Sequence, residues 1–193
     1  GCPMSFGYLA LVLHAHLPCV RLPESDVVLE EEWLVEASTE TYIPLLTMFD
    51  GLKRDGIDFK MTMSMPPPLV SMLKDPLLQE RYDEHLTNLE ELTEKEIERN
   101  EHNGHVKYLA EYYANEFNHT RQVWEDNKGD LISAFKGYVE SNNLDIITCG
   151  ATHGYLPLMK MYPEAVWAQL KVAVESHEEN FGRPPTGIWL PEC

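Results

Sequence analysis

Positive charge is scarce in this 193-residue chain: 15 Lys and Arg residues stand against 32 Asp and Glu residues, which gives a formal net charge of −17 at pH 7. A surface of this sign repels phosphate backbones and anionic lipid, so nucleic acid and membranes are not expected as partners. No apolar run approaches the roughly 18 residues of a membrane span. The opening residues also lack the basic start of a signal peptide.

Paired cysteines are absent as well, because the four thiols lie far apart in the sequence, at positions 2, 19, 149 and 193. Disulfide frameworks and cysteine-based zinc sites need cysteines at short, fixed spacings. The cysteine pattern therefore indicates a reduced, cytoplasmic protein. The hydrophobic content of 44% is enough to form one sizeable core.

Short apolar runs alternate with helical patterns in the order β-α-β-(long α)-β-α-β. Strands are expected at about residues 8–16, 58–69, 144–154 and 188–192, and the first is apolar on both faces, which predicts a central strand. Between the first two strands, Pro44 either kinks a helix or begins a second one. A long helical insertion occupies about residues 75–142, and a last helix ends at Gly182. This order predicts an α/β fold with a parallel sheet and right-handed crossovers.

Ionisable side chains occur at the carboxyl ends of three of the four expected strands. His14 and His16 share one face of the first strand, His153 ends the third and Glu192 ends the fourth. Parallel α/β folds place their active sites at this edge of the sheet. The sequence therefore predicts that these four side chains converge on one site.

Residue types alone leave three interpretations of this cluster open. Histidines with a glutamate could hold zinc with an open coordination position, although no HExxH or DxH pattern accompanies them. In carbohydrate chemistry, a glutamate works with a second carboxylic acid while His and Trp side chains hold sugar hydroxyls and ring faces. The polar strand ends could also serve only to cap a structural barrel.

Three motifs, in order and in the expected strand context, resemble signature regions of glycoside hydrolase family 57. They are HAHLP (14–18), GATHGYLPL (150–158) and GIWLPEC (187–193). The segments GYLALVLHAHLPCVRLPE, LEEEWLVEASTETYIPLL, DPLLQERYDEHL and IITCGATHGYLPL are similar in particular to the 1,4-alpha-glucan branching enzymes of that family. The resemblance extends from about residue 6 to the end of the chain.

The resemblance implies a distorted (β/α)7 barrel and a retaining double displacement on α-1,4-glucan (amylose, glycogen or starch) that forms α-1,6 branches. It implies neither a metal nor another cofactor. It assigns the catalytic nucleophile to Glu192, the sugar subsite beside the scissile bond to His14, His16 and His153, and an aromatic contact with the glucan to Trp33. Cys19 departs from the family pattern, which has an aromatic residue at that position.

The resemblance also implies that residues 1–193 are the N-terminal portion of a single catalytic barrel domain. The general acid of the family, an aspartate in a fourth signature region, and the helical domains that close the groove would lie further along. We therefore expect this chain to be a truncated fragment, inactive alone, of marginal stability and prone to self-association through the apolar edge of its last strand.

The molecule that accepts the transferred glucan chain decides the reaction type, so other activities of the family stay open. An α-amylase or a 4-α-glucanotransferase of the same family would use the same nucleophile. From other classes, a non-catalytic glucan-binding fragment or a histidine-based metal hydrolase remains as an alternative.

Overall fold

The computed structural model describes residues 7–24 and 30–192. The chain divides into two compact units. One, which we call the sheet unit, contains the described residues up to Pro18, Ile57–Val70 and the residues from Phe135 onward. The other, the helical unit, contains the described residues of Cys19–Gly56 together with Ser71–Ala134.

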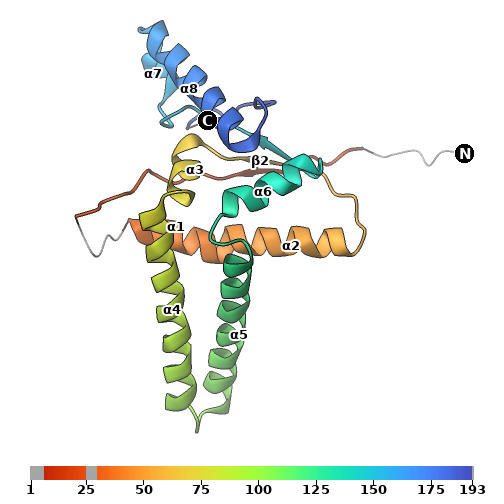
Figure 1. The fold of residues 1–193 in the computed structure, drawn as a ribbon, viewed down its shortest axis with the longest axis vertical. Coiled ribbons are helices and arrows are strands. Elements are labelled where there is room, and N and C mark those ends of the chain that lie inside the picture. Colours follow the sequence, from red (N-terminus) through yellow and green to blue (C-terminus); the bar gives the residue numbers. More distant parts are fainter. Residues whose placement is uncertain (1–6, 25–29, 193) are drawn as a thin grey trace, which may run out of the picture. The chain divides into compact units, whose positions relative to one another are not determined.

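The sheet unit is built on three parallel strands, β1 (Val12–His14), β2 (Met61–Ser64, labelled in Figure 1) and β3 (Leu144–Ile147). Their order in the sheet is β1-β2-β3. In the ladder, Val12 is opposite Thr62, and Met61 is opposite Leu144. The expected α/β class with parallel strands is therefore confirmed. Met63 and Ile146 are almost fully buried and form part of the core of this unit.

Two expectations for the strands were wrong in detail. β1 is at the edge of the sheet formed by the described residues and not at its centre, so its apolar neighbours Tyr8 and Leu9 are exposed. β2 begins later than expected, and its ladder ends before the triple proline that starts at Pro66, as the sequence indicates, because proline cannot donate to a ladder. These prolines instead lead into α3 (Pro67–Leu73), since proline is tolerated in the first turn of a helix.

The expected fourth strand forms only a single parallel bridge, between Thr148 and Ile188. The Thr148 amide donates to the Gly187 carbonyl at 3.1 Å, and the Trp189 amide donates to the Thr148 carbonyl at 2.9 Å. Pro191 cannot donate, and Glu192 has a φ of 54°, so the extended ladder does not continue. Self-association through this segment stays a prediction.

The last long helix of the sheet unit, α8 (Pro163–Phe181), is attached to β3 by a buried histidine. Proline near its start and the left-handed Gly182 after its end, with a φ of 75°, follow the expected capping pattern. His177 places Nε2 at 2.8 Å from the Ile146 carbonyl oxygen and Nδ1 at 2.8 Å from that of Arg183. One side chain thereby holds the helix, the strand and the turn that follows the helix. The short α7 (Leu156–Met159) precedes α8.

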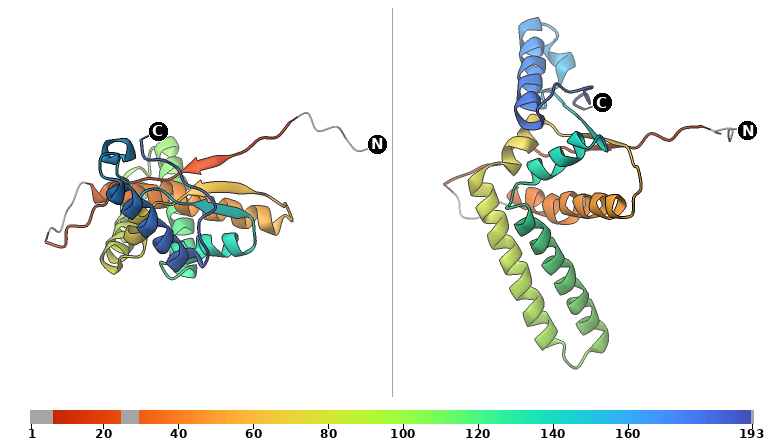
Figure 2. Two further views of the ribbon diagram at one scale, coloured as in Figure 1. Left: turned by 90° about the horizontal axis from the view of Figure 1, so that it is seen from above. Right: turned by 45° about the vertical axis from the view of Figure 1, so that its right-hand side comes forward.

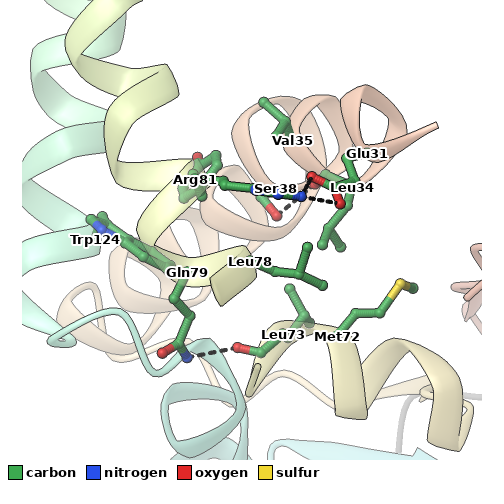
Figure 3. Close-up of a pocket in the computed structure, with 11 residues that line it drawn as sticks. Glu31, Leu34, Val35, Ser38, Met72, Leu73, Leu78, Gln79, Arg81 and Trp124 are labelled. Atoms are coloured by element: carbon green, nitrogen blue, oxygen red, sulfur yellow. Dashed lines mark hydrogen bonds and ion pairs between the residues drawn. The ribbon is translucent and has the colours of Figure 1, made fainter. Parts of the chain in front are cut away.

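The helical unit begins with α1 (Glu31–Ala37), continues through a π-helical turn, η1 (Ser38–Tyr42), and enters α2 (Ile43–Arg54). Pro44 lies in the first turn of α2, so the sequence alternative in which it begins a second helix is the closer one. A buried ion pair joins Glu31 to Arg81 beside a small apolar cavity of about 20 Å³ (Figure 3).

The long helical insertion is confirmed. It consists of α4 (Pro76–Arg99), α5 (Gly104–Asp126) and α6 (Leu131–Glu140). α4 and α5 form an antiparallel hairpin, visible lengthwise in the right-hand view of Figure 2. Arg121 of α5 pairs with Asp83 and Glu90 of α4, and Asp75 caps α4 by accepting from the Leu77 amide at 2.9 Å. No helix among the described residues is both long and apolar enough to cross a membrane.

Candidate active site

The carboxyl ends of β1 and β2 are tied together directly below the predicted site. His14 is the last residue of β1, and Ser64, which is fully buried, is the last residue of β2. The amide of Ala15 donates to Ser64 Oγ at 3.2 Å. This bond fixes the backbone between His14 and His16, so the direction of both imidazoles is set by the edge of the sheet.

The structure brings His14, His16, His153 and Glu192 together. The rings of His16 and His153 stack with centroids 3.4 Å apart and an interplanar angle of 11°. His153 Nε2 lies 3.6 Å from Glu192 Oε1, and the His14 ring lies 5.0 Å from that of Trp189. Trp33, the fifth predicted residue, is half-exposed on α1 in the helical unit.

Both His153 and Glu192 adopt left-handed backbone conformations, with φ of 53° and 54°. For residues with a Cβ, this conformation costs on the order of 1 kcal/mol and persists only where surrounding structure imposes it. Such strain is often found at functional sites. Here the two strained residues are the pair whose side chains face each other across 3.6 Å.

Gln169 of α8 holds the loop that carries His153. Its Oε1 accepts from the Thr152 amide at 2.9 Å, its Nε2 donates to Thr152 Oγ1 at 2.7 Å, and its backbone carbonyl accepts from the Ala151 amide at 3.1 Å. A Cβ on Gly150 would lie 3.0 Å from Gln169 Oε1, so a larger residue at this position would require the Gln169 side chain to shift by a few tenths of an ångström.

Cys149 contacts the other side of the His153 ring. Its buried Sγ lies 3.3 Å from His153 Nδ1. With the thiol donating to Nδ1, the ring carries its proton on Nε2, the atom that faces the Glu192 carboxylate. Cys149 and Gln169 were not singled out from the sequence. The four-residue spacing between Cys149 and His153 was the only sequence signal, and Gln169 had none.

The first two histidines are held in their neutral form. Burial and the neighbouring His153 lower the pKa of His14, and burial, His153 and His14 lower the pKa of His16; Glu192 opposes both shifts only in part. His16 Nδ1 is buried without a hydrogen-bond partner in the described part of the chain. A neutral imidazole offers one donor and one acceptor, which matches a sugar hydroxyl.

No group of three or more His, Cys, Asp or Glu side chains within residues 7–24 and 30–192 is arranged to hold a metal ion. The stacked arrangement of His16 and His153 presents ring faces to each other, whereas metal ligation needs ring nitrogens that converge on one point. The donor set therefore does not fit the zinc interpretation.

A groove of about 770 Å³ adjoins Glu192 in the sheet unit. Tyr155, Lys160 and Val166 are among the residues that line it, together with Leu190 and Glu192 itself. Its size is in the range of ligand-binding clefts, and its lining is mainly apolar with a few polar groups. Glu192 thus borders an open groove and also faces the histidine cluster through Oε1.

We expect the stability of the chain to fall as the pH drops below about 6.5, the ordinary pKa of histidine. Because the folded-state pKa values of His14 and His16 are lowered, the unfolded chain binds more protons in this window, so protonation favours unfolding. Urea titrations between pH 5 and 7 measure this slope. In the His14→Asn/His16→Asn variant the slope should be shallower, and an unchanged slope would contradict the assignment.

Replacing Gln169 with leucine should displace His153 without removing a group that contacts substrate. The variant loses two hydrogen bonds to Thr152, and displacements of about 1 Å near reacting atoms cost up to roughly 100-fold in rate. Imidazole NMR shifts of His153 in this chain are the direct measurement. The control is Gln122→Leu, which removes only a bond to Asp126 within α5. Unchanged His153 signals in the Gln169 variant would show that the loop carrying His153 keeps its conformation without the Gln169 hydrogen bonds, which would contradict this prediction.

Comparison with known proteins gives matches that point to one family. The family model for Glycosyl hydrolase family 57 matches residues 10–193. A 1,4-alpha-glucan branching enzyme of Thermococcus kodakarensis is 35% identical over 188 residues, which cover 97% of this chain and 27% of that protein. This chain therefore spans about a quarter of the length of that relative.

Two crystal structures have closely similar folds. The alpha-amylase AmyC of Thermotoga maritima superposes with a TM-score of 0.91 at 46% identity, over 95% of this chain and 35% of that one. A GH57-type branching enzyme of Pyrococcus horikoshii superposes with a TM-score of 0.91 at 35% identity, over 97% of this chain and 35% of that one. These matches confirm the partial (β/α)7-type barrel.

Proposed function

Because this chain belongs to glycosyl hydrolase family 57, we propose that it supplies the nucleophile and part of the sugar site of an enzyme that branches α-1,4-glucan. The observation that carries the proposal is the pairing of Glu192 with His153 at 3.6 Å beside an open groove. The relative in Thermococcus kodakarensis, a 1,4-alpha-glucan branching enzyme, supports the choice of reaction.

In the first step of the proposed reaction, a Glu192 carboxylate oxygen attacks the anomeric carbon of a glucosyl residue. The bond from that carbon to O4 of the next residue breaks, and a second carboxylic acid gives its proton to the leaving oxygen. The family resemblance assigns this acid to an aspartate outside the present sequence. The covalent glycosyl-enzyme retains the transferred chain on Glu192.

In the second step, the C6 hydroxyl of an acceptor glucan attacks the same carbon and releases the Glu192 carboxylate. The acceptor proton passes to the carboxylate that acted as the acid, so the site is restored and an α-1,6 linkage is formed. Neutral His14 and His16, together with His153, bind the hydroxyls of the transferred sugar. The aromatic face of Trp33 contacts the glucan. Amylose, glycogen and starch are the substrates that fit this scheme.

A hydrolytic alternative has one specific observation in its favour. The alpha-amylase of Thermotoga maritima has 46% identity with this chain, against 35% for the branching enzymes of Thermococcus kodakarensis and Pyrococcus horikoshii. In a hydrolase, water replaces the acceptor hydroxyl in the second step, while the first step and Glu192 are the same.

Amylose digestion distinguishes the two reactions. In an enzyme of the relatives' length that includes this sequence, branching should produce α-1,6 anomeric signals in the NMR spectrum with little gain in reducing ends. New reducing ends without α-1,6 signals would favour the amylase, and neither product would contradict both proposals.

A further inference from the structure

A second groove in the helical unit is lined by residues of α5 and of the helical segment formed by η1 and α2. Helices α2 and α5 lie next to each other (Figure 1). Its volume is about 610 Å³. The side chains that carry the argument are those of Glu40, Thr47, Tyr112, Tyr113, Glu116 and Phe117. None of them belongs to the cluster around Glu192, and the reaction proposed above does not use them.

One wall of this groove is aromatic. Tyr112 and Tyr113 are 49% and 53% exposed on α5, and their rings meet edge to face with centroids 5.6 Å apart. The Tyr113 ring stacks with that of Phe117 at 6.0 Å. These contacts hold the tyrosine rings in place while leaving much of their surface open. Such rings offer an apolar face and a polar tip, the combination suited to the C–H face and the hydroxyls of a sugar.

The polar groups of the groove are acceptors and neutral groups. Glu40 and Glu116 are exposed, and Thr47 Oγ1 lies 3.1 Å from His119 Nε2. No lysine or arginine is among the described residues that line the groove. Together with the net charge of −17, this composition disfavours phosphates, nucleic acid and acidic peptides. It suits a neutral ligand with many hydroxyl donors.

The backbone on the opposite wall is irregular. In η1, the Ile43 amide donates to the Ser38 carbonyl, five residues earlier, where an α-helix would use a four-residue step. Pro44 has no N–H for an α-helical bond to Glu40, which favours the wider turn. The turn contains Thr39 and Glu40, both of which line the groove. Single π turns inside helices occur frequently at functional sites.

We propose that this groove binds a second segment of α-glucan, separately from the site around Glu192. The ligand class rests on the proposed function, whereas the groove, its aromatic wall and its charge are features of the helical unit alone. A long glucan offers many overlapping segments to the groove, whereas a short oligosaccharide offers few. Each long glucan chain should therefore bind the groove more tightly than a short oligosaccharide does.

The test measures binding of this chain to amylose and to maltoheptaose by affinity electrophoresis and calorimetry. Tyr112→Ala/Tyr113→Ala should weaken amylose binding about tenfold, because two stacking faces are lost. Tyr108→Ala is the matched control, since Tyr108 is also exposed on α5 but does not line the groove. It should bind as the unmodified chain does. Thermal melts establish that both variants fold.

A second variant keeps the test independent of the tyrosines. Glu40→Gln/Glu116→Gln keeps the shape of the groove and weakens its acceptors, so amylose binding should fall by several-fold. If both groove variants bind amylose as well as the control does, the groove proposal is overturned. The proposed branching reaction is tested separately, by the products of amylose digestion. Nitration of tyrosine tests whether the groove is open in an enzyme of the relatives' length that includes this sequence. If Tyr112 and Tyr113 resist nitration there in the absence of glucan, protein covers the groove and the groove proposal is overturned. Failure of the unmodified chain to bind amylose would also overturn it.

Discussion

Replacing Glu192 with glutamine should lower turnover by several orders of magnitude in an enzyme of the relatives' length that includes this sequence. An amide has the shape of the carboxylate but cannot form the covalent intermediate at a useful rate. Substrate binding should change little, because the histidine cluster and the groove remain. The measurement is kcat for amylose, with KM as the indicator of binding.

Two controls separate loss of the nucleophile from loss of structure. Glu179→Gln changes an exposed carboxylate on α8 and should leave kcat unchanged. Glu192→Ala opens space for a small anion, and added azide should then form a glycosyl azide of inverted configuration from an activated substrate. Near-normal turnover by Glu192→Gln would overturn the assignment of the nucleophile.

Replacing Glu31 with alanine should lower the free energy of unfolding by about 3 kcal/mol. Arg81 Nη1 donates to the two carboxylate oxygens of Glu31 at 2.5 and 2.7 Å, and the two side chains are only 18% and 10% exposed (Figure 3). Breaking a buried pair from one side typically costs about 3–5 kcal/mol, because the remaining charge loses much of its electrostatic compensation. The lower end applies because Arg81 Nη2 also donates to the Leu22 carbonyl at 3.3 Å.

Chemical denaturation measures the loss of unfolding free energy in Glu31→Ala. A solvent-exposed ion pair serves as the control. Glu91 and Lys95 are 57% and 71% exposed in α4, so Glu91→Ala should cost no more than about 0.5 kcal/mol. Glu31→Ala/Arg81→Met removes both charges and should recover part of the lost stability. A loss below about 1 kcal/mol for Glu31→Ala would mean that the pair is solvated.

Much of the local structure could be predicted from the sequence because its causes are local. Proline near the start of α8 and glycine after its end define that helix. The order of strands and helices predicted a parallel sheet, and a parallel sheet brings carboxyl ends to one edge. The position of His14, His16, His153 and Glu192 at strand ends was therefore visible before the fold was known, whereas their roles rest on the family motif.

The contacts that shape the site depended on the tertiary structure, because they join residues with no periodic relation in the sequence. Gln169 reaches the loop before His153 across 17 positions, and Ser64 reaches Ala15 across 49. The reduction of the fourth strand to one bridge follows from Pro191, which cannot donate, and from the turn at Glu192. Residue types and spacings determine which side chains lie at the carboxyl edge of the sheet. Packing decides which of their atoms come into contact, because each such contact depends on the path of the whole chain between the two residues.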